Sequence, residues 1–165
     1  MAPVRIDAEY FSPDSCAFIE LLHRHGVRYV IVGGEAVIFH GHARLTGDID
    51  FFFGPETGNG SRLFAALDQF WSGDIPGIES VEELTDQSLI LQFGRPPNRI
   101  DLMNHIEGVS FEDVWRGRVE AVLVTSEGEL SVSYIGLDEL IRNKRAAGRP
   151  RDLDDLAYLE ATRRR

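Results

Sequence analysis

Apolar residues recur at two different spacings along the chain, and the changes of spacing predict a succession of helices and strands. Between Phe18 and Leu22 they fall on one face of a helix. Ser12 offers an N-cap before that stretch and Gly26 a C-cap after it, so we expect a helix over residues 13–25. Elsewhere, short runs of β-branched and aromatic residues bounded by glycine and proline indicate strands.

The full pattern predicts a mixed central sheet flanked by helices. We expect strands at residues 28–32, 48–53, 88–93, 99–103, 119–124 and 130–134. We expect helices at residues 13–25, 34–41, 61–71, 110–115, 137–147 and 151–162. This order indicates the α/β (α+β) class rather than a regular βαβ alternation. Because no repeat or linker divides the chain, we expect a single domain over residues 1–165, with a C-terminal helical portion of about residues 136–165.

The composition indicates a cytoplasmic protein. Of the 165 residues, 43% are apolar and 27% are charged, as is usual for globular proteins. No apolar run approaches the roughly 20 residues needed to cross a bilayer, and no apolar signal segment follows the N-terminus. Cys16 is the one cysteine, which excludes an internal disulfide. We therefore expect a cytoplasmic location and no membrane partner.

The charge of the chain argues against general nucleic-acid binding. The formal net charge is −10, and binding of this kind depends on neutralising phosphates, so we expect no stable DNA binding. Positive charge is nevertheless concentrated near the C-terminus, at Arg142, Lys144, Arg145, Arg149, Arg151 and residues 163–165. These residues could form a basic patch beside an acidic metal site, or simply a solvated helix face.

The most informative stretch of the chain runs from Gly33 to Asp50. The pair Gly33 and Gly34 follows one predicted strand, and Asp48 and Asp50 occupy alternate positions of the next. Alternate positions of a strand face the same way, so both carboxylates point to one side. Mg²⁺ prefers such oxygen ligands, and two ions can hold the attacking and leaving oxygens of an in-line displacement. The alternative is that both aspartates face solvent at the edge of a sheet.

A third carboxylate could complete this site. Asp101 lies within an apolar strand, where an isolated acid needs a partner. On a strand beside Asp48 and Asp50 it would be a third metal ligand, and it could take the proton of an attacking hydroxyl. The alternative is an ion pair with Arg99 or Arg95 at the end of the strand.

Other residues of the same stretch could contact phosphate. Glycine lets the backbone approach a ligand closely, and N–H groups at the start of a helix favour anions, so the glycine pair could bind a triphosphate. Arg44 and Thr46 lie just before the aspartates and could reach phosphate oxygens. His40 and His42 are not accompanied by further histidine or cysteine at zinc-ligand spacing, so we expect them to pack or to form hydrogen bonds.

These residues together resemble a known superfamily. Gly33-Gly34, the Asp48–Asp50 pair and the later Asp101 are similar to the pattern of the nucleotidyltransferase superfamily of DNA polymerase beta. The longer string from Gly33 to Asp50 resembles the AbiEii-like and related small prokaryotic nucleotidyltransferases, many of them encoded in toxin–antitoxin loci. Residues 137–144 and 148–156 also resemble the C-terminal part of that group. The chain departs from the superfamily at Gly34, where serine is common.

The resemblance implies a nucleotidyltransferase fold with a divided site. Asp48, Asp50 and Asp101 would hold Mg²⁺, with two ions expected and Mn²⁺ a possible substitute, and Asp101 would assist deprotonation. Gly33 and Gly34 would cradle the triphosphate of a nucleoside triphosphate (NTP) substrate.

The C-terminal helices would supply the other half of the site. Lys144 would contact the triphosphate or the developing charge as a point charge. Asp152 would orient Lys144 or Arg149, or touch the nucleotide, and Arg149 would bind the nucleotide. The alternative is a solvated pair of helices with local ion pairs.

The resemblance therefore implies an enzyme that moves a nucleoside monophosphate (NMP) from an NTP to an acceptor hydroxyl and releases pyrophosphate. RNA, tRNA or a protein would be the acceptor, in a toxin-like role, and a cognate toxin or antitoxin protein is a possible partner. A nucleotidyltransferase-fold antitoxin or regulatory binding partner with little turnover is the alternative, and a hydrolase using the same metals is a third.

Overall fold

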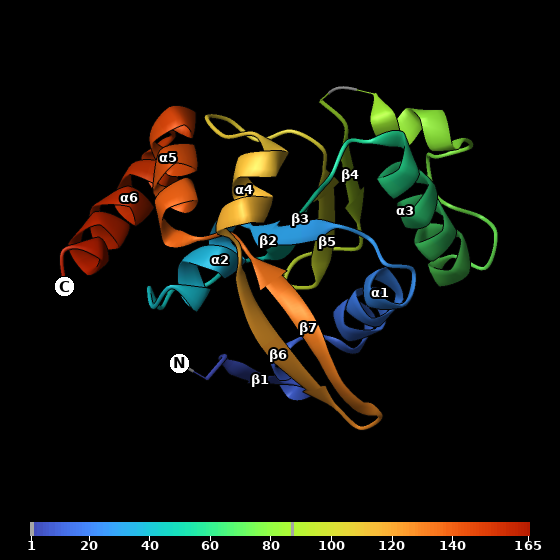
Figure 1. Ribbon diagram of the computed structural model, residues 1–165, viewed down its shortest axis with the longest axis horizontal. Coiled ribbons are helices and arrows are strands. Elements are labelled where there is room, and N and C mark those ends of the chain that lie inside the picture. Colours follow the sequence, from blue (N-terminus) through green and yellow to red (C-terminus); the bar gives the residue numbers. More distant parts are fainter. Residues whose placement is uncertain (1, 87) are drawn as a thin grey trace.

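A curled, mixed sheet organises the computed structural model, which describes residues 2–86 and 88–165 (Figure 1). Within those residues the sheet has seven strands in the order β1-β6-β7-β2-β3-β5-β4. The strands are β1 Arg5–Asp7, β2 Tyr29–Val32, β3 Asp48–Phe53, β4 Ile90–Phe93, β5 Arg99–Met103, β6 Val119–Thr125 and β7 Gly128–Tyr134. The α-helices are α1 Pro13–Arg24, α2 Gly33–Phe39, α3 Thr57–Phe70, α4 Phe111–Gly117, α5 Leu137–Ala147 and α6 Pro150–Arg163. Short 3₁₀ helices cover Ala8–Tyr10 and Val81–Thr85. The predicted mixed class is confirmed.

Two of the sequence predictions need correction. Helix α3 begins at Thr57 rather than at residue 61, because Asn59 does not sit in a solvated loop. Its amide is buried and donates to the carbonyls of Arg28 and Gly54, at 3.0 and 2.9 Å, so a tertiary contact overrides the turn signal. Strand β1 was not predicted, because it has three residues and is defined by its parallel pairing with β6.

The register between three strands positions the stretch that the sequence singles out. Strands β2 and β3 are antiparallel with Val32 opposite Asp50, so the chain leaves β2 beside that aspartate. Strands β3 and β5 are parallel with Asp50 opposite Asp101. Residues in register across neighbouring strands point to the same face, so the predicted third carboxylate lies beside the first two.

The phenylalanine side chains at the end of β3 point alternately to the two faces of the sheet. Phe51 packs edge-to-face on Phe18 of α1, and Phe52 packs on Phe111 at the start of α4, with ring centroids 5.3 and 5.2 Å apart. Because Asp50 is in phase with Phe52, the aspartates lie on the face that α4 covers. Helices α5 and α6 pack against each other at the C-terminal end of the chain (Figure 1). In the described part of the chain, no helix is long and apolar enough to span a bilayer.

The close approach of α2 to β3 gives a stability prediction. Gly33 has a φ of +66°, and a Cβ there would lie 2.0 Å from Oδ2 of Asp50. Gly77 has a φ of +76°, but its Cβ would meet no heavy atom of the described residues within 4 Å. We expect Gly77→Ala to lower the free energy of unfolding by about 1–2 kcal/mol, the cost of the left-handed backbone alone.

For Gly33→Ala we expect a loss of about 2–5 kcal/mol, because the collision with Asp50 adds an overpacking cost to the same backbone cost. Urea unfolding of the two variants measures both losses. Equal losses would show that the contact with Asp50 does not constrain this position.

Candidate functional site

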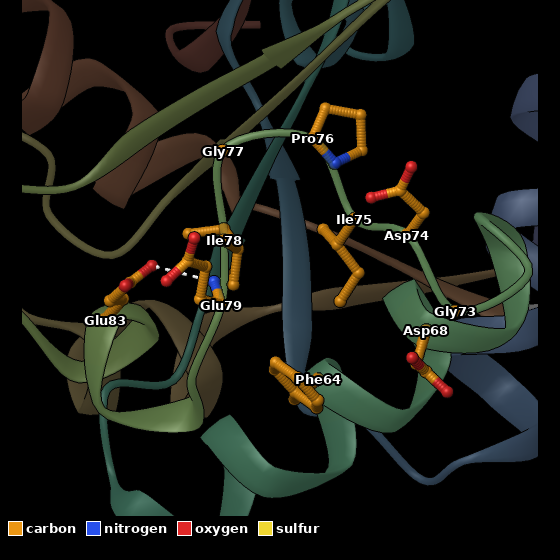
Figure 2. A pocket seen from close by; sticks show the side chains of 10 residues that line it. All are labelled: Phe64, Asp68, Gly73, Asp74, Ile75, Pro76, Gly77, Ile78, Glu79 and Glu83. Atoms are coloured by element: carbon orange, nitrogen blue, oxygen red, sulfur yellow. Dashed lines mark hydrogen bonds between the residues drawn. The ribbon is translucent and has the colours of Figure 1, made fainter.

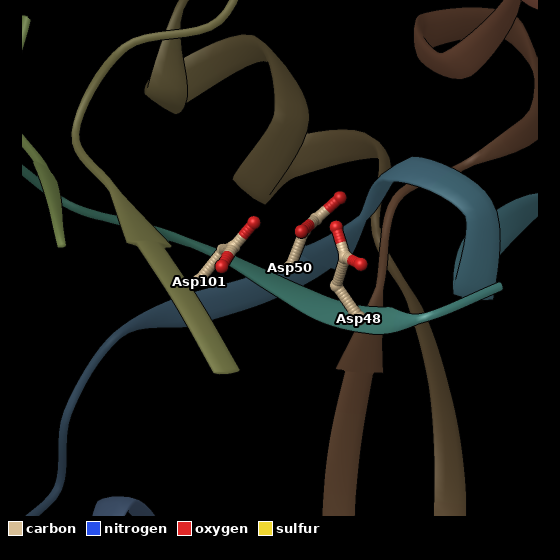
Figure 3. Close-up of side chains that lie close together, drawn as sticks. All are labelled: Asp48, Asp50 and Asp101. Carbon is tan, nitrogen blue, oxygen red and sulfur yellow. The ribbon is translucent and has the colours of Figure 1, made fainter. Parts of the chain in front are cut away.

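Three carboxylates from two strands converge on one face of the sheet. Asp48 and Asp50 come from β3 and Asp101 from β5 (Figure 3). Each offers an oxygen, and these oxygens all lie within 4.8 Å of one another. Within the described residues this is the one group of three or more acidic, histidine or cysteine side chains with such spacing. The predicted convergence of the three aspartates is therefore present in the structure.

The cluster is electrostatically costly for the protein alone. Burial and the nearby carboxylates of Asp101 and Asp48 raise the pKa of Asp50 to about 7. Burial also raises the pKa of Asp101, with Arg99 acting in the opposite direction. Oδ1 of Asp50 is buried and has no hydrogen-bond partner among the described residues. Burying an oxygen without a partner carries a desolvation cost, and a bound cation would offset that cost.

Arg99 is a cation already in contact with the cluster. Its Nη2 lies 2.9 Å from Oδ2 of Asp48, and its Nε lies 3.1 Å from Oδ1 of Asp101. The ion pair that was the alternative interpretation of Asp101 is therefore present together with the carboxylate cluster. Gln92 of β4 adds a hydrogen bond of 3.4 Å to Oδ2 of Asp101.

A cavity of about 340 Å³ opens beside the aspartates. Its lining combines the glycine pair, acidic groups and basic groups: Gly33, Gly34, Arg44, Thr46, Asp48, Asp50, Lys144, Arg149, Arg151 and Asp152. All the residues predicted for the site line this cavity except Asp101, which belongs to the carboxylate cluster with Asp48 and Asp50. The structure thus brings residues far apart in the sequence to one place, although it assigns no role to them.

Buried ion pairs attach the C-terminal helices to this cavity. The Nζ of Lys144, a residue of α5, lies 3.0 Å from Oδ1 of Asp152 and 3.1 Å from Oδ2 of Asp155, both on α6. All three side chains are buried. Although burial acts in the opposite direction, hydrogen bonds from Arg149 and Lys144 hold the pKa of Asp152 below its usual value. The alternative interpretation was a solvated pair of helices with local ion pairs. The ion pairs are present, but Lys144, Asp152 and Asp155 are buried.

Asp155 lies in the stretch 148–156 that resembles the C-terminal half of the site, but it is not among the individually predicted site residues. It is 1% exposed and contacts Nε and Nη2 of Arg44 at 2.9 and 3.0 Å, in addition to Lys144. It thereby connects the loop before β3 to α5 and α6. Its position three residues after Asp152 on one helix face was the signal that could have identified it. Arg151 also lines the cavity, in keeping with the interpretation of a basic patch beside the metal site.

The glycine pair leaves room for neighbouring side chains. A Cβ on Gly34 would lie 2.9 Å from Nη2 of Arg44 and 2.9 Å from Oγ1 of Thr46. The absence of a side chain at Gly34 therefore allows both groups to reach the cavity. The hydroxyl of Thr46 donates to the carbonyl of Asp48 at 3.3 Å, which holds it beside the strand.

Both histidines of this stretch have structural contacts. A ring nitrogen of His40, Nε2, lies 2.8 Å from the carbonyl oxygen of Ile135. The ring of His42 stacks on Tyr158, with centroids 4.3 Å apart. These contacts confirm the expected packing and hydrogen-bonding roles.

A larger cavity does not offer comparable chemistry. It measures about 690 Å³, lies between α3 and residues 73–83, and has no basic side chain in its lining (Figure 2). Its carboxylates are separated, with Asp68 and Asp74 at one end and Glu79 and Glu83 at the other. Acidic walls without a cation repel phosphate, so the smaller cavity is the better candidate.

The donor set at Asp48, Asp50 and Asp101 fits a hard divalent cation. All three donors are carboxylates, which Mg²⁺ and Mn²⁺ prefer over the ligands of zinc sites. Oδ1 of Asp50 and Oδ1 of Asp101 are both buried without a hydrogen-bond partner among the described residues. The site therefore has the charge, the ligand type and the convergence that a divalent ion requires.

The pKa of Asp50 gives a pH-dependent stability prediction for the metal-free protein. A carboxyl whose pKa is raised on folding keeps its proton in the native state at pH values where the unfolded chain has lost it. Stability should therefore fall as the pH rises from about 4 through about 7, as Asp50 is forced to ionise.

The unfolding free energy of Asp50→Asn, taken relative to that of the unmodified protein, should be about 2–3 kcal/mol higher at about pH 8 than at about pH 5. Denaturant unfolding in a chelator at both pH values measures this difference, with Asp154→Asn on the exposed side of α6 as the control for loss of one charge. A difference that is the same at both pH values would contradict the account.

Comparison with known proteins identifies the family. The sequence model of a family described as a nucleotidyltransferase of unknown function, DUF6036, matches residues 16–161. No curated protein matches the chain. The matched range covers most of the chain and every residue of the cavity and the carboxylate cluster. The chain therefore belongs to this nucleotidyltransferase family.

Proposed function

We propose that this protein is a metal-dependent nucleotidyltransferase that moves an NMP from an NTP to an acceptor hydroxyl and releases pyrophosphate. The observation that carries the proposal is the convergence of three carboxylate oxygens within 4.8 Å beside a cavity with basic side chains. Membership of a nucleotidyltransferase family supports the reaction class. Membership of the polymerase beta-like superfamily, near its AbiEii-like members, is part of the proposal.

In this proposal the aspartates form the metal-binding half of the site. Asp48, Asp50 and Asp101 would hold Mg²⁺ or Mn²⁺, which when bound supplies charge neutralisation to the attacking and leaving oxygens of the displacement. Asp101, the buried member of the cluster, would accept a proton from the acceptor hydroxyl.

The basic side chains of the cavity are suited to the triphosphate. Lys144 and Arg44 are fixed there by buried carboxylates, so they are oriented before a ligand binds. Arg149 and Arg151 are exposed at the rim and add positive charge. Gly33 and Gly34 leave the backbone accessible at the side nearest the aspartates. Fixed cations at this position would stabilise charge on the departing pyrophosphate.

For the acceptor we propose a set of molecular classes rather than one molecule. The strong negative charge of the chain does not favour an extended nucleic-acid surface, so a tRNA end, another RNA or a protein hydroxyl would have to be recognised locally. A toxin-like role on such an acceptor, with a cognate partner protein, follows from the resemblance stated above.

The proposal predicts transfer that depends on the aspartate pair. We expect purified protein with Mg²⁺, cell extract and an NTP labelled at the α-phosphate to label an acceptor, for at least one of the NTPs. Asp48→Ala/Asp50→Ala should lower the initial rate of labelling by at least about a hundredfold, because metal-assisted charge stabilisation contributes several kcal/mol to such reactions.

Asp68→Ala/Asp74→Ala is the matched control, since it removes two carboxylates that lie in the other cavity. It should label as the unmodified protein does. Label in free NMP or nucleoside diphosphate, with none in an acceptor, would identify a hydrolase. Binding of Mg²⁺ and nucleotide without any transfer would favour a regulatory binding partner, and equal labelling by both double variants would refute the assigned site.

A further inference from the structure

Arg99 occupies the approach to the carboxylates that the proposed function assigns to metal. We infer that Arg99 is a positioning residue that serves as the counter-cation of the metal-free cluster, and that a divalent ion must displace its guanidinium from Asp48 to bind. The inference rests on the proposed metal site, and it assigns to this side chain control over metal affinity.

The strand register fixes Arg99 in this position. Asp48 on β3 lies directly opposite Arg99 on β5, and Asp101 follows two residues later on the same face. The guanidinium therefore bridges the two strands, with Nη2 2.9 Å from Oδ2 of Asp48 and Nε 3.1 Å from Oδ1 of Asp101. Two of the three proposed ligands are thus engaged by one side chain.

No other side chain of the described residues forms an ion pair with Asp48 or Asp101. Asp50 lies outside the reach of this ion pair, and its Oδ1 has no partner among the described residues. The cluster therefore contains three carboxylates and one contacting guanidinium, which leaves negative charge for a stronger cation. A divalent ion places twice the charge in a smaller volume and accepts all three carboxylates at once.

Arg99 can release the carboxylates only if its side chain moves away from them. A guanidinium stays protonated at any physiological pH, so it cannot leave the site by losing its charge. The side chain of Arg99 is 29% exposed, whereas that of Asp101 is 8% exposed. The arginine thus has a solvent-facing side toward which it can swing, while the buried carboxylate stays in place.

This arrangement predicts an effect opposite to that of an ordinary structural residue. If Arg99 only held β3 and β5 together, its removal would loosen the aspartates and weaken metal binding. If it competes with the metal, its removal should strengthen metal binding. Charged hydrogen bonds of this kind contribute about 1.5–3 kcal/mol, so release from competition corresponds to about tenfold or more in affinity.

The test is a Mn²⁺ titration of chelator-treated protein without nucleotide, followed by the electron paramagnetic resonance signal of free Mn²⁺. We expect Arg99→Gln to bind Mn²⁺ about tenfold or more tightly than the unmodified protein. Arg99→Lys should fall between them, because a lysine keeps the charge but cannot engage both carboxylates as a planar fork. Arg95→Gln is the matched control, since Arg95 is exposed in the turn before β5 and forms no ion pair in the described part of the chain.

The outcomes separate this inference from the proposed function. Unchanged or weaker Mn²⁺ binding in both Arg99 variants would overturn the inference while leaving the metal site intact. Absence of Mn²⁺ binding in all proteins, including the unmodified one, would instead refute the metal-dependent function. If Arg99→Gln does not fold by circular dichroism, the direction of the change in Arg99→Lys decides the matter.

Discussion

Repulsion among Asp48, Asp50 and Asp101 is the constraint that the rest of the structure must oppose. Three carboxylate oxygens within 4.8 Å of one another would separate if their side chains were free, and burial of Asp101 with partial burial of the other two limits screening by water. They are held together by backbone pairing, since Asp50 is in register with Asp101 and opposite the end of β2. The apolar residues that follow in β3 anchor that strand on both faces of the sheet. Hydrophobic burial in β3 thus offsets the cost of an arrangement that is unfavourable for the protein alone.

The C-terminal helices supply the complementary charge. Asp155 and Asp152 are buried acids that form ion pairs with Lys144, Arg44 and Arg149, so these three lining cations are held by carboxylates. Such networks are costly to bury and contribute little stability for their size, but they orient charged groups reproducibly. Acidic and basic side chains therefore line one cavity of about 340 Å³, in a chain whose net charge is −10. Local arrangement, and not overall charge, makes the site compatible with a polyanion.

The sequence predicted the elements whose local signals are strong and the carboxylates of the candidate site. Strands β3 and β5 and helix α5 fall on their predicted bounds, because alternation and capping signals are strong there. The carboxylate cluster followed from the spacing of Asp48 and Asp50 and from one acid in an apolar strand. The start of α3 and the existence of β1 could not be predicted, because Asn59 and a three-residue edge strand depend on tertiary partners. Likewise, the double role of Asp155 depends on how α6 packs, and the contact of Arg99 with Asp48 depends on strand register.

The central claim is that the three aspartates form a divalent-metal site facing a triphosphate cavity. Anomalous diffraction from crystals grown with Mn²⁺ and a non-hydrolysable NTP analogue tests it most directly. We expect an anomalous peak within coordination distance of carboxylate oxygens from Asp48, Asp50 and Asp101, with the triphosphate between Gly33-Gly34 and Lys144. Bound nucleotide elsewhere on the protein, with no anomalous peak at the three aspartates, would contradict it.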